Sequence, residues 1–284
     1  MKKVIFPILS LLLIISCEKY PLDSNSFEPD ANLFVNTSLS SQAPLSRAQR
    51  PLSELCTKIS FALYKDGERL KSISQSAGDN GFGSIAVKIL PGTYTLLIVG
   101  HSTASNATTT DIQKINFSGK VSDTFVYSEE IEIGEEPLTI NAKAVRNVAM
   151  FQLNITDDIP KEVTRLKFYY TGGSSSFDAT TKAGSVNSRQ TEYRDVNPTQ
   201  KTYEIFTFPH NTGDDKLKIT ISALDDADNV IAERILSDVG IETGIITQCS
   251  LALFDGSEGG NSQQVNITIT ADDEWKGVIE YIPY

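Results

Sequence analysis

The stretch "KISFALYKDGERLKSISQS", residues 58–76, decides the fold class of this chain. Ile59, Phe61 and Leu63 alternate with their neighbours, so these three side chains lie on one face of an extended strand. The Asp-Gly pair that follows is a favoured hairpin turn, and apolar residues return after it. The stretch therefore predicts two antiparallel strands joined by a tight turn.

The same period of two continues along most of the chain. Residues 84–100 predict another strand pair with a turn at Pro91-Gly92, and residues 123–145 predict two more strands. From Asn147 onward the alternation restarts and continues to the end. No stretch repeats apolar residues at helical spacing over three turns. Many short strands separated by Gly, Pro, Asn and Asp turns indicate an all-β fold of antiparallel sandwich type.

The number of predicted strands is about twice what one seven-stranded sandwich needs. We therefore expect two tandem β-sandwich domains, at residues 31–143 and 144–284. The boundary is placed where "KAVRNVAMFQLNI" restarts the alternation without a long linker.

The N-terminus reads as an export signal. Two lysines precede an apolar run of 12 residues, which is too short to span a bilayer and fits the apolar region of a signal peptide. The run ends in Ser16-Cys17, which resembles a bacterial lipobox. We expect a signal peptide at residues 1–16, cleavage between Ser16 and Cys17, and lipidation of Cys17 with acyl chains such as palmitate. A plain signal peptide with a chance cysteine is the alternative.

The next segment, residues 17–30, is polar and contains two prolines, so it predicts a tether between the lipid and the first domain. The formal net charge is −11, and losing the two lysines of residues 1–16 makes it −13. A chain this acidic is not attracted to phosphate backbones, which argues against nucleic-acid binding. Cys56 and Cys249 lie far apart in the sequence; we expect small buried residues, and a single bridge is the alternative.

Motifs for catalysis or metal binding are missing from the sequence. His101 and His210 have no neighbouring Cys or His, so no zinc spacing exists. The acidic run in "LDDADNVI", residues 224–231, lacks the central Gly and the distal Glu of a calcium loop and fits a hairpin turn better. The Gly/Ser-rich residues 171–185 have no phosphate-loop signature. We expect no enzyme, no metal and no cofactor.

Aromatic residues could serve a glycan-binding surface instead. The candidates are Phe168, Tyr169, Tyr170, Tyr193 and Trp275. Phe168 and Tyr170 share one face of a strand and Tyr169 lies on the other, so part of this group belongs to a core. A glycan-binding surface lipoprotein is the alternative function.

The lipobox, the acidic chain and the serial sandwiches together resemble the fimbrillin-like lipoproteins of Bacteroidales-type (type V) fimbriae, in particular the FimB-type anchor and fimbrial-subunit family. Residues 51–102 carry the resemblance in the first domain. Residues 144–188, "FTFPH" and "ADDEWKGVIEY" carry it in the second. The resemblance implies two transthyretin-like sandwich domains and a structural role at the outer membrane in cell adhesion. It implies other fimbrial subunits as partners, with host ligands or glycans as further candidates.

That resemblance gives the segment "ANLFVNTSLS", residues 31–40, a special role. Its alternation predicts a strand of the first domain. In stalk subunits of the family a protease cuts after an Arg in the following loop, the first strand leaves, and a neighbouring subunit supplies a replacement by strand addition. Arg47-Ala48 is the candidate cleavage site, and a solvated loop arginine is the alternative. Residues 255–284 supply either the last strands of the second domain or a donated segment; we favour the former.

Overall fold

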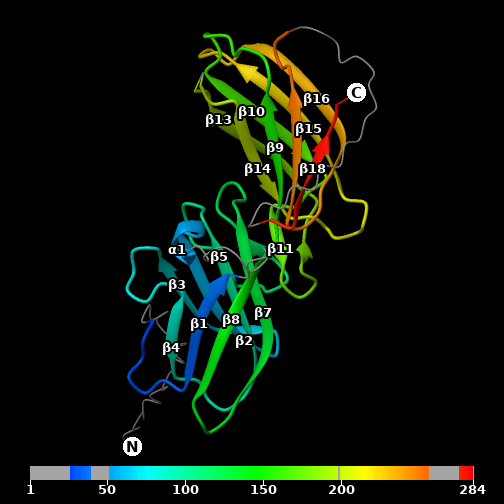
Figure 1. The fold of residues 1–284 in the computed structure, drawn as a ribbon. Coiled ribbons are helices and arrows are strands. Elements are labelled where there is room, and N and C mark those ends of the chain that lie inside the picture. Colours follow the sequence, from blue (N-terminus) through cyan, green and yellow to red (C-terminus); the bar gives the residue numbers. More distant parts are fainter. Residues whose placement is uncertain (1–25, 40–50, 198, 256–274, 284) are drawn as a thin grey trace, which may run out of the picture.

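The computed structural model describes residues 26–39, 51–197, 199–255 and 275–283. These residues form strands joined by turns and loops, with one helical turn, α1 (Leu52–Leu55), so the all-β prediction is confirmed. Figure 1 shows two halves stacked end to end. The first half contains β1 (Leu33–Leu39), β2 (Lys58–Lys65), β3 (Glu68–Ser76), β4 (Ser84–Val87), β5 (Gly92–His101), β6 (Ile115–Asn116), β7 (Thr124–Ile133) and β8 (Leu138–Arg146).

The first half is a two-layer sandwich. Strands β3-β2-β5-β7 form one layer and β8-β1-β4 the other, and the layers join through a short pairing of β7 with β8 at Phe125–Arg146 and Val126–Val145. Alternate residues of both layers meet in one buried core. Its members include Leu33, Val35, Ile59, Phe61, Leu63, Ile73, Ile85, Val87, Leu96, Ile98, Ile131 and Ala142.

The hairpin predicted at residues 58–76 is confirmed, because β2 and β3 pair antiparallel through the turn. The second predicted pair is wrong in its pairing. β4 and β5 are strands, but β4 pairs with β1 while β5 pairs with β2 and β7. Residues 88–91 carry the chain from one layer to the other, so that both strands place their apolar faces in the same core.

The second half is also a two-layer sandwich. Sheet β13-β10-β15-β16 faces sheet β14-β9-β17-β18, and β18 pairs parallel with β17. The last described strand thus belongs to this half, as expected for the end of the chain. The strands are β9 (Ala149–Ile155), β10 (Arg165–Thr171), β11 (Ser176–Asp178), β12 (Ala183–Gly184), β13 (Arg189–Asp195), β14 (Thr202–Thr207), β15 (Lys216–Leu224), β16 (Val230–Gly240), β17 (Ile245–Leu251) and β18 (Gly277–Tyr281).

A third core lies where the halves meet. The small sheet β12-β11-β6 joins strands of both halves. The outer faces of β2 and β5 are covered here by the chain between β5 and β7 together with residues of the second half, so these two strands are buried on both sides. The contributors include Tyr64, Leu97, Val99, Val126, Met150, Phe177, Phe208 and Trp275. The predicted boundary after Lys143 falls within β8, and the division into two domains stays a prediction.

The acidic run at residues 225–228 forms the turn of the β15–β16 hairpin. The Asp225 carboxylate accepts hydrogen bonds from the N–H groups of Ala227 and Asn229 at 2.9 and 2.8 Å. It therefore serves the turn itself, as the sequence predicts. Among the helices of the described residues, none is both long and apolar enough to span a bilayer.

Candidate functional site

Strand β1 is the element that the sequence singles out, and the structure places it inside a sheet. It lies between β8, with which it runs parallel, and β4, with which it runs antiparallel (Figure 1). Both of its backbone edges are therefore hydrogen-bonded. The prediction of a resident strand in the first half is confirmed.

The side chains of β1 alternate as a strand between core and solvent requires. Leu33 and Val35 are fully buried between the two layers, whereas Phe34 and Asn36 face outward. Completely burying two aliphatic side chains stabilises the fold by roughly 1.5–3 kcal/mol each. Without β1 the groove between β8 and β4 would expose the core residues Ile85, Val87 and Ala142.

Polar contacts hold the chain just before β1. The Asn32 amide donates to the carbonyl of Ile89 and accepts from its N–H, both at 2.8 Å. The Glu28 carboxylate pairs with Lys71 and accepts the N–H of Lys88 at 2.6 Å. Partial burial raises the pKa of Glu28, but these donors outweigh it and the pKa lies below its usual value. Residues 26–30, the end of the predicted tether, are also attached to β4, since the Glu28 N–H donates to the carbonyl of Ala86 at 2.8 Å and the Ala86 N–H donates to that of Ser26 at 2.7 Å.

The far end of β1 is fitted closely to the loop that precedes β4. The Thr37 N–H donates to the carbonyl of Gly83 at 2.8 Å. Gly83 has a φ of +87°, and a side chain there would also collide with Leu52, because its Cβ would lie 2.6 Å from Leu52 Cδ2. The predicted sites at Ser16, Cys17, Arg47 and Ala48 lie outside the described residues.

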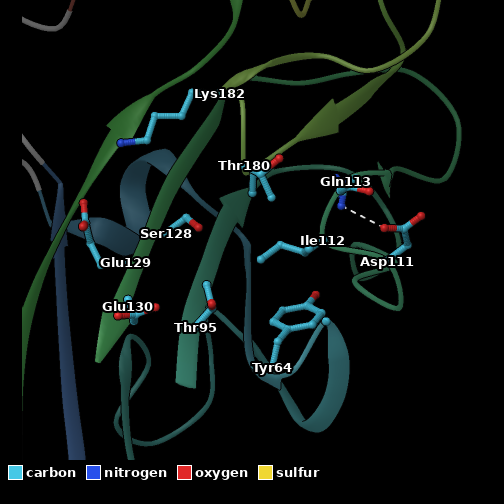
Figure 2. Close-up of a pocket in the computed structure, with 12 residues that line it drawn as sticks. Tyr64, Thr95, Asp111, Ile112, Gln113, Ser128, Glu129, Glu130, Thr180 and Lys182 are labelled. Carbon is cyan, nitrogen blue, oxygen red and sulfur yellow. Dashed lines mark hydrogen bonds between the residues drawn. The ribbon is translucent and has the colours of Figure 1, made fainter. Parts of the chain in front are cut away.

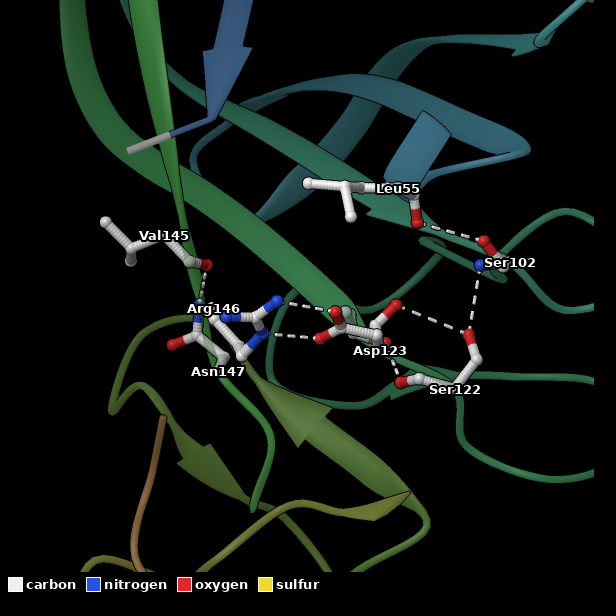
Figure 3. A network of polar contacts seen from close by, with 8 residues as sticks. Leu55, Ser102, Ser122, Asp123, Val145, Arg146 and Asn147 are labelled. Carbon is white, nitrogen blue, oxygen red and sulfur yellow. Dashed lines mark hydrogen bonds and ion pairs between the residues drawn. The ribbon is translucent and has the colours of Figure 1, made fainter. Parts of the chain in front are cut away.

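An ion pair between a buried arginine and a partly buried aspartate marks the junction of the halves (Figure 3). Arg146, at the end of β8, donates through Nε and Nη2 to the two carboxylate oxygens of Asp123, each at 2.7 Å. The guanidinium carbon lies 4.7 Å from the ring centroid of Phe125 and 4.0 Å from that of Trp275. One side chain thus connects the first half to the segment that enters β18.

A wide pocket of about 520 Å³ opens beside the outer face of β5 and β7 (Figure 2). Thr95, Ser128 and Glu130 lie on the strands, with Asp111 and Lys182 on the loops facing them. The lining contains no histidine or cysteine, and none of its described hydroxyl groups donates a hydrogen bond to a lining carboxylate, as an activated nucleophile would.

The histidines and cysteines are isolated. Among the described residues, no group of three or more His, Cys, Asp or Glu is placed to hold a metal ion. His101 is fully buried and contacts Thr103, and His210 donates through Nδ1 to the carbonyl of Gly184 at 3.0 Å. Cys56 and Cys249 are free, buried thiols in different halves, and burial raises the pKa of each to about 12. The predicted reading of both as small buried residues is confirmed.

The glycan candidates separate as alternation requires. Phe168 and Tyr170 are fully buried, whereas Tyr169 and Tyr193 are 39% and 48% exposed. Trp275 belongs to the junction core. The sequence did not indicate the Glu28, Asn32 and Arg146 contacts, because their partners lie tens of residues away and no local pattern identifies them.

A comparison with solved structures finds several matches to this chain. A candidate cell adhesion protein from Bacteroides eggerthii matches with a TM-score of 0.50 and 11% identity, covering 87% of this chain and 96% of that one. A fimbrial assembly protein from Parabacteroides distasonis matches with a TM-score of 0.39 and 11% identity, over 79% and 91% of the two chains. The fimbrial anchor protein Mfa2 from Porphyromonas gingivalis matches with a TM-score of 0.41 and 10% identity, over 71% and 80%.

No protein-family model and no curated protein matches the sequence. At such low identity, the likeness to the Bacteroides eggerthii protein shows a shared fold.

Proposed function

We propose that this chain is a fimbrillin-like lipoprotein that serves as a structural subunit or anchor of a fimbrium at the outer membrane. The signal ending in Ser16-Cys17 supports lipid attachment. The fold shared with a candidate cell adhesion protein supports a role at the cell surface. Stable anchoring takes two acyl chains, which a diacylglyceryl cysteine supplies.

The observation that carries the proposal is the position of β1. It is the first described strand after the lipidation site, and it is hydrogen-bonded on both sides between β8 and β4. In an anchor this strand stays in place and transmits force from the first half to the membrane. In a stalk subunit, cleavage at Arg47-Ala48 would release it and open a groove for a neighbour's strand. Other fimbrial subunits are the partners in both cases.

Immunoblotting of cell-bound and sheared fractions distinguishes the two roles. For an anchor, wild type and Arg47→Ala should both remain cell-bound, begin at Cys17 with a diacylglyceryl adduct by mass spectrometry, and support normal fimbriae. Arg50→Ala is the matched control, because Pro51 protects the Arg50 bond from most proteases. Loss of polymer in Arg47→Ala alone, with wild type beginning at Ala48, would assign the stalk role. An unmodified Cys17 would contradict the lipoprotein proposal.

A further inference from the structure

The solvent face of sheet β13-β10-β15-β16 carries an unusual set of side chains. Cross-strand registers place Tyr169 beside Thr191, Lys167 beside Tyr193, and Thr171 between Arg189 and Lys218. These positions share one face, because residues opposite each other in a sheet point the same way. We name Lys167, Tyr169, Arg189, Tyr193 and Lys218 the basic-aromatic face.

The two tyrosines of this face are held on a rigid base. They are diagonal neighbours on adjacent strands, which places such residues about 7–8 Å apart. The reverse side of the same strand, β10, is anchored by the fully buried Phe168 and Tyr170. Two flat rings at this spacing offer a platform to a ligand with flat apolar surfaces.

The cations of the face are available. Within the part of the chain that the structure describes, Lys167, Arg189 and Lys218 make no ion pair or side-chain hydrogen bond. Arg165, at the margin, pairs with Asp228 and lies 5.8 Å from the ring centroid of Tyr193. Three unpaired cations on one sheet contrast with the net charge of −11.

Acidic groups also lie near the face, but among the described residues none of them forms an ion pair with these cations. Asp195 lies at the end of β13, and Asp238 lies in the bulge of β16 opposite Lys218. Glu233 lies on the same far strand, where it accepts a hydrogen bond from Ser222. Glu192 points into the core and is bound by Tyr170 at 2.5 Å and by Arg194 at 2.7 Å. The charge of Glu192 is thus compensated inside the sandwich.

A pocket of about 500 Å³ adjoins the face along β13. Arg189 and Tyr193 belong to both, and Lys120 and Ser175 also line the pocket. The lining includes Glu192, whose carboxylate is held by Tyr170 and Arg194. Lys120 has no partner among the described residues either. The pocket therefore adds a fourth cation together with hydroxyl and amide groups.

We propose that the basic-aromatic face and the adjoining pocket bind an acidic glycan, a sugar chain that bears carboxylates. The flat C–H faces of pyranose rings stack on tyrosine, the carboxylates pair with the lysines and arginine, and the pocket supplies hydrogen bonds to hydroxyl groups. Single-stranded nucleic acid also uses aromatic and cationic groups. The densely spaced phosphates of a nucleic acid are repelled by the net negative charge of the chain. The carboxylates of an acidic glycan are more widely spaced, so they can pair with the few cations of this face.

The proposal is tested with the chain from residue 18 onward and two probes, oligogalacturonate, with one carboxylate per ring, and dextran, with none. We expect saturable binding of oligogalacturonate in titration calorimetry, weakened by salt, and no binding of dextran. Tyr193→Ala should weaken binding roughly tenfold, whereas Tyr193→Phe should retain it, because the ring is what stacks. Lys167→Gln and Arg189→Gln each remove one positive charge, and each should weaken the binding of oligogalacturonate roughly threefold.

Lys143→Gln is the matched control, since Lys143 is exposed on β8 in the other half and its loss removes the same charge. It should bind as wild type does. Equal weakening by Lys143→Gln, equal binding of dextran, or unchanged binding by Tyr193→Ala would overturn the proposal. Tighter binding of single-stranded oligothymidine through the same residues would overturn it too and assign the face to nucleic acid. Fimbrial attachment is measured separately, so failure here leaves the anchor test unaffected.

Discussion

Arg146 is a single residue on which the junction of the halves depends. Its side chain is 4% exposed, and its guanidinium pairs with the Asp123 carboxylate through two hydrogen bonds. Removing one partner of a buried pair leaves the other charge uncompensated. Arg146→Met should therefore lower the free energy of unfolding by about 2–4 kcal/mol, measured by urea denaturation.

The matched test of this explanation is the double variant Arg146→Met with Asp123→Leu. It should recover part of the loss, because the Asp123 carboxylate is then no longer left without the guanidinium that neutralises it. The alternative outcome is a double variant that is less stable than Arg146→Met by as much as Asp123→Leu alone destabilises wild type. The loss would then arise from packing against Phe125 and Trp275 instead of from charge.

The buried His101 predicts that the free energy of unfolding depends on pH. Burial first, and then the positive charge of Lys58, lower the pKa of His101 from 6.5 to about 4. Its ring also contacts Phe117 edge-on at 5.4 Å, and its Nε2 has no partner among the described residues. Below pH 6.5 His101 is protonated in the unfolded chain, whereas in the folded chain it stays neutral until about pH 4.

The contribution of His101 to stability is therefore complete above pH 6.5 and is lost as the pH falls toward 4. The loss should reach on the order of 3 kcal/mol, at about 1.4 kcal/mol per pH unit. Urea denaturation of wild type and His101→Gln between pH 4 and 7.5 measures it, since other groups titrate equally in both proteins. Parallel pH profiles for the two proteins would refute this assignment.

Among the strands, β1 is predicted to be held in its sheet mainly by the side chains that face the core. Leu33 is fully buried in the core between the layers, so Leu33→Ala should lower the free energy of unfolding by about 2–5 kcal/mol. Asn36→Ala removes a side chain of similar size from the outer face of the same strand and should cost less than about 1 kcal/mol.

Thermal denaturation of both β1 variants beside wild type tests this contrast. Similar losses for both would mean that β1 is held by its backbone hydrogen bonds alone. A large loss for Leu33→Ala only would support a groove that demands apolar side chains, which is also what a replacement strand would have to provide.

For the whole molecule, the junction core predicts that the halves unfold together. The chain carries its own reporters: Cys56 is buried in the first half, Cys249 in the second, and the single tryptophan, Trp275, at the junction. In a protein from residue 18 onward, thiol labelling of Cys56, thiol labelling of Cys249 and Trp275 fluorescence should change at one urea midpoint.

Phe208→Ala provides the control for cooperativity. Phe208 is fully buried in the junction core, where its ring stacks on Phe117 and lies tilted against Phe177. Truncating Phe208 should give Cys56 and Cys249 different urea midpoints of labelling. The contact between the halves is then weakened, while the core inside each sandwich is unchanged. Two midpoints already present in wild type would show that the junction does not couple the halves.

The sequence by itself determined the local structure. Alternation set the strands, and Asp66-Gly67 and the run at residues 225–229 set two hairpins. Alternation also put Phe168 and Tyr170 on one face of their strand and Tyr169 on the other, and the structure then buries the first face. These features depend on neighbours along the chain, because a strand has period two and a tight turn has its own residue preferences.

Only the tertiary structure decided which strands pair. It placed β1 between β8 and β4, separated β4 from β5, buried β2 and β5 on both faces, and brought Lys167, Arg189 and Lys218 onto one face. Pairing between distant strands is chosen by the summed fit of many side chains across the core, and alternation is equally satisfied by several partners. For that reason the sequence could suggest a resident strand but could not identify its neighbours.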